Sequence, residues 1–308
     1  MFKIKQYCLL IFIASSQLVF AQRHKHSDNT NSVYIIPFHL TSYNNLSVPA
    51  ILNGKDSLNL MFHTAANAIT LTEETIKRLN DLSFSGVDTV KSWGGSDNES
   101  RFSKNNILQI GSLKWEGQSI WENKNSGQET DGKFGTDLFE NKVIELDFEE
   151  NVMRISNNLP GKIKKYQKLK LSFENDYMFI EAGFKIADLT LSNKFLIHSG
   201  YSGALLFDDK FVAENKLDQK LKIVDEKQLK DSYGNILKTQ KAVLPLLSIG
   251  KMNLPNVPAS FFTGGIGRQK MSIIGGDVLK RFNIIIDANR TFIYLKANKL
   301  KTLNYSNI

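Results

Sequence analysis

The sequence predicts an all-β protein in which two similar β-barrel lobes flank a central cleft, with few short helices. Three observations support this prediction. Most of the chain consists of short apolar runs bounded by Gly, Asn, Asp and Ser, which is typical of strands joined by turns. Helical patterns are few and short. Two motifs recur in the same order in both halves of the chain, which indicates a duplicated lobe.

The first 21 residues have the features of a secretory signal peptide. Lys3 and Lys5 precede an apolar segment of about 14 residues, and the small residue Ala21 stands before a plausible cleavage point. The apolar segment is short for a bilayer, so we expect no stable membrane span and export to the periplasm or out of the cell. Residues 22–32 are polar and without periodicity, which predicts a flexible N-terminus of the mature chain.

Composition and charge exclude several classes of protein. The only cysteine, Cys8, lies in the signal peptide, so the mature chain has no disulfide, no cysteine nucleophile and no thiolate metal site. Without Lys3 and Lys5, 37 basic and 31 acidic residues leave a net charge of +6. The basic residues are spread along the chain except in 162–170, where only one aromatic residue accompanies them. We therefore expect no nucleic-acid partner.

Two short helices are expected, one in each half. The stretch LTEETIKRLN (71–80) places Thr72 as the N-cap, with acidic residues in the first turn. The stretch DDKFVAENKL (208–217) is its counterpart in the second half.

The first repeated motif is an apolar run that ends in a histidine. LMFHTAANAITL (60–71) aligns with FLIHSGYSGALL (195–206), 135 residues later. In both copies the histidine is followed by Thr or Ser and a small residue. Each copy also precedes one of the two expected helices.

The second repeated motif aligns without a gap. FGTDLFENKVIELDFEENVMRI (134–155) matches IGGDVLKRFNIIIDANRTFIYL (274–295) at an offset of 140 residues. Chance explains one such match easily, but not two in the same order at nearly equal offsets. We therefore predict an N-terminal lobe at 33–158, a linker at 159–167, a C-terminal lobe at 168–300 and a tail at 301–308.

This arrangement resembles the pepsin- and retropepsin-like aspartic proteases, and is most similar to their bacterial two-lobed branch. The resemblance covers nearly all of the mature chain. It implies that each lobe supplies one Asp-Thr-Gly or Asp-Ser-Gly motif, and that the two carboxylates share a proton and activate one water molecule. This sequence has His-Thr-Ala at 63–65 and His-Ser-Gly at 198–200 instead. His63 and His198 thus occupy the positions of the family's catalytic aspartates.

The resemblance also assigns roles to the neighbouring residues. Thr64 and Ser199 are expected to hydrogen-bond across the lobes and lock the two loops, and Gly200 allows a close approach of the backbone and an unusual turn. Ala65 adds a methyl group where the family has glycine. Four aspartates of the second motif fall in buttressing or ordinary strand positions and are not expected to replace the missing acids: Asp137, Asp147, Asp277 and Asp287.

The chemistry of the histidine pair leaves three possibilities open. Two neighbouring buried imidazoles discourage each other's protonation, so both should be neutral at pH 7, and conventional aspartic-protease activity is not expected. His63 and His198 could instead act as a base directly or hold a metal ion such as Zn²⁺, but two ligands alone bind a metal weakly. We favour the simpler interpretation that the imidazoles are hydrogen-bonded to each other or to Thr64 and Ser199, with no cofactor.

The leading hypothesis is therefore a non-catalytic binder of an extended peptide or protein segment in the cleft between the lobes. The alternative is a peptidase that uses the histidine pair. A hairpin at 90–102 is the candidate flap over the cleft, with Trp93 as the contact and Gly94 and Gly95 as a hinge. We expect a monomer. A two-lobed frame that has kept no ligand at all is a further alternative.

Overall fold

The computed structural model describes residues 32–79, 82–91, 97–186, 188–230, 236–262 and 269–306. The predicted signal peptide, all but the last residue of the predicted flexible N-terminus, and Trp93, Gly94 and Gly95 of the candidate flap lie outside these ranges. Within the described residues, no helix is long and apolar enough to cross a bilayer.

The first lobe is an eight-stranded sheet in the order β2-β3-β4-β9-β5-β8-β7-β6. An additional pairing of β3 with β7 closes six of these strands into a barrel. The strands are β2 (His39–Leu40), β3 (Leu46–Leu52), β4 (Asp56–Phe62), β5 (Ile69–Thr72), β6 (Gly86–Lys91), β7 (Asp97–Ile110), β8 (Leu113–Asn123) and β9 (Gly132–Phe134). The β6–β7 hairpin spans the candidate flap, and Lys91 pairs with Asp97 where the described parts of its two strands end.

The second lobe repeats this topology. Its order is β13-β14-β15-β20-β16-β19-β18-β17, which is the order of the first lobe with every label raised by eleven, and β14 with β18 makes the equivalent closing pair. The parallel pairs β4–β9 and β5–β8 recur as β15–β20 and β16–β19. The strands are β13 (Ser172–Glu174), β14 (Tyr177–Ile186), β15 (Leu189–His198), β16 (Leu205–Leu206), β17 (Ile223–Lys230), β18 (Ile236–Ile249), β19 (Met252–Phe262) and β20 (Ser272–Gly275).

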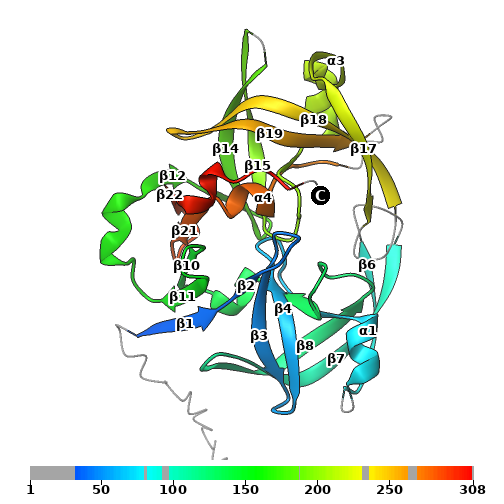
Figure 1. Ribbon diagram of the computed structural model, residues 1–308. Helices are drawn as coiled ribbons and strands as arrows, with labels where there is room; N and C mark the ends of the chain where they lie inside the picture. The colour runs from blue at the N-terminus through cyan, green and yellow to red at the C-terminus, as the bar shows by residue number, and fades with distance from the viewer. Residues whose placement is uncertain are drawn as a thin grey trace, which may run out of the picture.

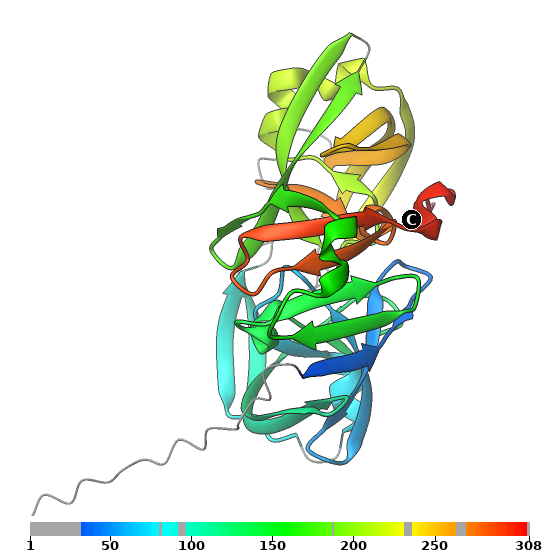
Figure 2. The ribbon, with the colours of Figure 1, turned by 90° about the vertical axis from the view of Figure 1, so that its left-hand side faces the viewer.

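A third sheet of six strands joins the lobes, in the order β1-β11-β10-β21-β22-β12. Figure 2 shows it between the first lobe below and the second lobe above. In its middle, Glu145 pairs with Ile285, which is 140 residues away, the same offset as the sequence repeat. The pseudo-twofold axis therefore passes through this pair. The strands are β1 (Val33–Pro37), β10 (Val143–Asp147), β11 (Val152–Ser156), β12 (Gln167–Lys170), β21 (Phe282–Ile286) and β22 (Phe292–Ala297).

The burial of each strand follows its sequence pattern. β10 and β21 lie in the middle of the central sheet, are buried at every residue, and are nearly continuous apolar runs. Glu145 interrupts the run in β10, and its carboxylate is satisfied by Arg154 at 2.9 Å and Lys162 at 2.6 Å. A strand with one wet face, such as β3, alternates buried and exposed residues along its second half.

Both expected helices are confirmed. α1 (Glu73–Arg78) begins at Thr72, whose hydroxyl accepts from the Thr75 N–H, and α2 (Asp209–Asn215) begins in the same way at Asp208. The other helical segments are single turns: η1 (Thr136–Phe139), η2 (Gly161–Lys165), α3 (Leu217–Lys220), α4 (Gly276–Leu279) and η3 (Lys299–Thr302). Figure 1 shows α1 and α3 at opposite ends of the molecule, with α4 between the lobes.

Candidate functional site

The two predicted histidines meet where the lobes meet. His63 directly follows β4, and His198 is the last residue of β15, so the pseudo-twofold axis brings two equivalent loops together. The two imidazole centroids are 4.5 Å apart and the rings are tilted by 57°. His63 is buried, whereas His198 is partly exposed, so solvent reaches one side of the pair.

Four hydrogen bonds lock the two loops to each other. The Thr64 hydroxyl donates to the Ile197 carbonyl at 2.7 Å and accepts from the Ser199 N–H at 3.0 Å. The Ser199 hydroxyl donates to the Phe62 carbonyl at 2.7 Å and accepts from the Thr64 N–H at 3.0 Å. Each hydroxyl therefore satisfies two buried backbone groups of the opposite lobe. This reciprocal geometry is the cross-lobe contact expected for these two residues.

Space explains the glycine in the second loop. A Cβ atom at Gly200 would lie 2.3 Å from Cδ2 and 2.4 Å from Nε2 of His63, so no other residue fits without moving that ring. The backbone of Gly200 is not in the left-handed region, which corrects the expectation of an unusual turn. Ala65, at the equivalent position of the first loop, packs against the apolar cluster around Phe179 and Phe262. Its methyl group has room that Gly200 lacks.

The two rings do not hydrogen-bond to each other, contrary to the simplest expectation. His63 Nδ1 accepts instead from the backbone N–H of Ala65 at 3.1 Å, so the proton of the neutral ring is on Nε2. His198 Nδ1 is buried and has no hydrogen-bond partner in the described part of the chain. Since a buried N–H without an acceptor is rarer than a buried lone pair without a donor, we assign the His198 proton to Nε2 as well.

Both imidazoles are neutral at pH 7, as expected from their positions. Burial lowers the pKa of His198 from 6.5 to about 4, and the positive charge of Lys133 lowers it further. Burial also holds the pKa of His63 well below 6.5, with smaller contributions from His198 and Lys133. None of the described carboxylates contributes to these two pKa values. The site therefore differs from a carboxylate dyad in charge as well as in shape.

Lys133 is a site residue that the sequence analysis missed. It lies on β9, opposite Met61 on β4 and Thr70 on β5, one residue before Phe134, whose carbonyl accepts from the His63 N–H. Burial lowers its pKa to about 8, so the ammonium keeps most of its charge at pH 7. A signal for it was present in the repeat, because the offset of 140 aligns Lys133 with the buried apolar residue Ile273.

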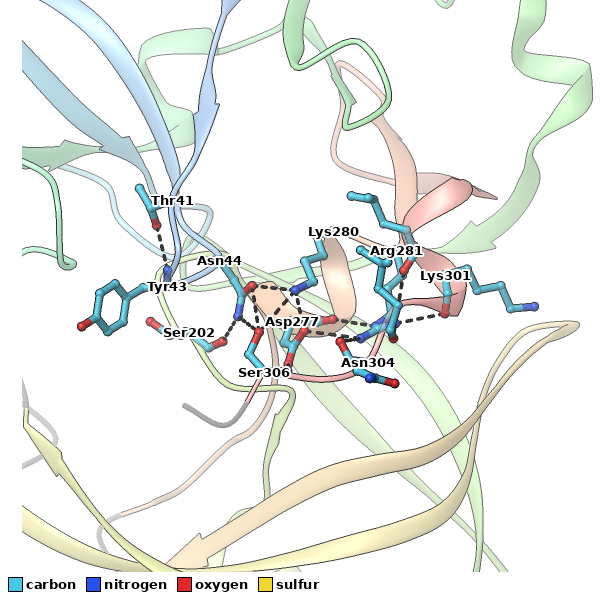
Figure 3. A network of polar contacts seen from close by, with 12 residues as sticks. Thr41, Tyr43, Asn44, Ser202, Asp277, Lys280, Arg281, Lys301, Asn304 and Ser306 are labelled. Atoms are coloured by element: carbon cyan, nitrogen blue, oxygen red, sulfur yellow. Dashed lines mark hydrogen bonds and ion pairs between the residues drawn. The ribbon is translucent and has the colours of Figure 1, made fainter.

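A second set of contacts holds the loop between β2 and β3 against the second lobe. Asn45 donates to the Ser199 carbonyl at 3.1 Å, and Asn44 donates to the Ser202 carbonyl at 2.8 Å. Figure 3 shows how Asn44 continues into a buried polar network. Lys280 donates to the Asn44 side-chain oxygen at 2.7 Å and pairs with Asp277 at 2.8 Å. This network supports the loop that carries Ser199 from behind.

The C-terminal residues belong to the same network. Arg281 is fully buried, its ε-nitrogen donates to the Asp277 carbonyl at 2.8 Å, and its guanidinium stacks on Tyr305 at 3.7 Å from the ring centroid. The guanidinium also donates to four backbone carbonyls between residues 300 and 304. The segment predicted as a tail is thus wrapped around one buried arginine up to Ser306.

The four aspartates of the second motif have structural contacts, as expected. Asp147 and Asp287 each accept from two backbone N–H groups of the turn that follows their strand. Asp277 pairs with Lys280 and Arg281. Asp137 lies in an exposed single-turn helix, and partial burial raises the pKa of its carboxyl. These contacts account for their place in the repeat without a catalytic role.

No group of three or more His, Cys, Asp or Glu side chains in the described ranges could hold a metal ion. His63 and His198 alone would supply two ligands, one fewer than a catalytic zinc site normally has.

Comparison with known proteins bears on the fold. No protein-family model and no curated protein matches the sequence. Among solved structures, the chain is similar to an aspartic proteinase from Irpex lacteus with a TM-score of 0.61 and 12% sequence identity. The match covers 89% of this chain and 100% of that one. The protein therefore has the two-lobed, mostly β fold of the pepsin-like aspartic proteinases, which confirms the predicted fold class.

Proposed function

We propose that this protein is an exported homologue of the pepsin-like aspartic proteases that has lost both catalytic aspartates and binds an extended peptide or protein segment without cleaving it. One observation carries the proposal. Two neutral imidazoles, His63 and His198, occupy the meeting point of the two loops, and the Thr64–Ser199 lock that holds such a site together is intact.

Acid–base chemistry argues against cleavage by the mechanism of this family. That mechanism needs one ionised and one protonated carboxyl group around a water molecule. A histidine whose pKa is about 4 is a weak general base, since the efficiency of proton transfer falls as the pKa of the base falls below the working pH. His63 is further restricted, because its Nδ1 lone pair is taken by the Ala65 N–H.

Binding needs less than catalysis does. In this fold an extended peptide lies between the lobes and adds backbone hydrogen bonds in the manner of an extra strand. The β6–β7 hairpin of the first lobe provides a covering element of the expected kind. These features require no acid, so they can persist after the catalytic pair is lost.

The test combines binding and cleavage on the purified mature protein. A library of fluorescent extended peptides is titrated by anisotropy, and the same peptides are incubated from pH 3 to pH 8 with and without EDTA and examined by mass spectrometry. We expect binding of a subset of peptides and no cleavage. The His63→Ala/His198→Ala double variant is the control for both readouts.

Two outcomes would overturn the proposal. Cleavage that resists EDTA and disappears in the double variant would establish a peptidase based on the histidine pair. Cleavage that EDTA abolishes would establish a metal-dependent enzyme in which the two imidazoles are ligands. Absence of binding by every peptide at millimolar concentration, in a protein shown to be folded, would favour a frame without a ligand at this site.

A further inference from the structure

We propose that Lys133, His63 and His198 together form a carboxylate-binding site, so that the segment bound between the lobes presents an acidic group to the histidine pair. The inference rests on the proposed function and specifies its ligand. The protein would then reverse the charge arrangement of the protease: the bound segment, and not the protein, supplies the carboxylate.

The hydrogen-bonding capacity of the site supports this assignment. The Nδ1 atoms of both rings are turned inward, one to the Ala65 N–H and one to a buried position without a partner. The protons are therefore on Nε2, and both rings are donors there. The Lys133 ammonium is also a donor and cannot accept. A carboxylate has two oxygens that only accept, so it is the common biological group that complements three donors and one positive charge.

The charges around the site lead to the same conclusion. The titratable groups that face the pair are His63 from the end of β4, His198 from β15, Lys133 from β9 and Tyr201 from the following turn. Burial raises the pKa of Tyr201 to about 12, so this residue stays neutral. Lys133 thus supplies the positive charge of the site. Burial alone accounts for the lowered pKa of Lys133, without a compensating carboxylate from the described chain.

A partly desolvated ammonium is costly to the folded protein unless something returns the lost solvation. An incoming carboxylate would do so and would raise the pKa of Lys133. The partial exposure of His198 leaves one side of the pair open to such a ligand. The carboxylate can come from an Asp or Glu side chain or from the free C-terminus of the bound segment.

The experiment uses matched octapeptides with an acetylated N-terminus and an amidated C-terminus. A single Glu is moved along a neutral frame, and each peptide has a partner with Gln at the same position. A third set has Gln throughout and a free C-terminal carboxylate. At pH 7 we expect at least one Glu peptide, or the free-carboxylate set, to bind about tenfold more tightly than its neutral partner, because charge-assisted hydrogen bonds are stronger than neutral ones.

Variants identify the group that recognises the charge. Lys133→Met should abolish the preference for the acidic peptide, whereas Lys133→Arg, which keeps the charge, should retain much of it. Lys170→Met, at an exposed position of β12, is the matched control and should bind as the wild type does. Lys133→Met should fold, since it removes a buried charge, and its thermal midpoint should not fall. The preference should weaken above pH 8 as Lys133 loses its proton.

The outcomes separate this inference from the proposed function. If peptides bind but Glu and Gln, and free and amidated ends, are equivalent at every position, the carboxylate site is wrong and peptide binding stands. A preference that survives in Lys133→Met also refutes it. If none of the peptides binds, the proposed function fails and this inference fails with it.

Discussion

Acid should destabilise this protein through its histidine pair at a pH where most proteins are near their maximum stability. His63 and His198 are buried and neutral in the folded state, but both imidazoles protonate freely in the unfolded chain. Between the unfolded pKa of 6.5 and the folded value, the unfolded state binds more protons, so the free energy of unfolding falls as the pH falls. The perturbation is simply a change from pH 7 to pH 5.

The magnitude follows from the shift at His198. With a pKa of about 4 in the folded protein and 6.5 in the unfolded chain, this residue alone lowers the free energy of unfolding by about 2 kcal/mol between pH 7 and pH 5. His63 adds a contribution of the same sign. A loss of this size is a substantial part of the total stability of a typical protein, about 5–15 kcal/mol.

Urea denaturation at pH 7, 6 and 5 measures this loss. The comparison is with a His63→Asn/His198→Asn variant, which cannot titrate in this range, and with His39→Asn, which removes an exposed histidine of β2. The wild type and His39→Asn should lose the same free energy of unfolding from pH 7 to pH 5, and the double variant should lose at least about 2 kcal/mol less. An equal loss in all three proteins would refute the assignment of buried neutral imidazoles.

Three further substitutions test the frame, each by urea denaturation at pH 7. Gly200→Ala places a methyl group 2.3 Å from the His63 ring and should cost about 1–3 kcal/mol, whereas a cost near zero would show that the ring moves freely. Thr64→Val leaves a buried carbonyl and a buried N–H unpaired and should cost about 2–4 kcal/mol. Arg281→Met leaves Asp277 and the C-terminal carbonyls without their partner and should cost about 3–5 kcal/mol, and an unchanged stability would contradict the role given to the tail.

Much of the fold could be predicted because the chain contains its main evidence twice. Each copy of a motif is a weak signal, but two motifs at nearly the same offset require two equivalent lobes. The structure repeats the strand order of one lobe in the other, and the offset of 140 reappears in the pairing of Glu145 with Ile285. What the repeat could not show is that residues 143–156 and 282–297 leave their lobes to form a shared sheet, because the pairing between copies has no local sequence signal.

Parts of the site that break the symmetry could not be predicted. Asn44 and Asn45 act through one loop of the first lobe only, and Arg281 acts through the C-terminal segment, which has no counterpart in the first lobe. Lys133 was hidden because a lysine in a short strand is usually exposed. Its importance is visible only once β9 is seen beside both histidines.

The lock between the loops also explains how the aspartates could be lost. Thr64 and Ser199 bond to backbone groups and to each other's N–H, and none of these four bonds involves residue 63 or 198 through its side chain. The frame therefore does not depend on the charge of the pair. Two neutral imidazoles also avoid the repulsion of two buried carboxylates, which must share a proton to coexist.

Lys133 should now prevent a simple return to protease chemistry. In a His63→Asp/His198→Asp variant, the ammonium beside the pair would lower the pKa of the carboxyl groups by about 1–3 units, so neither would hold the proton that the mechanism needs. Adding Lys133→Ile, which matches the apolar Ile273 of the other lobe, removes that charge. We expect the triple variant to cleave unstructured peptides at acidic pH and the double variant to remain inactive.

The measurement is mass-spectrometric detection of cleavage from pH 3 to pH 6, with Lys133→Ile alone as the control. Equal cleavage by the double and triple variants would show that Lys133 does not govern the protonation of the pair. Cleavage by the triple variant alone would show that the frame has kept what catalysis requires, and that three side chains separate this site from an aspartic-protease site. The lysine, which has no counterpart in the motif of either lobe, would then be as decisive for the present function as the two histidines.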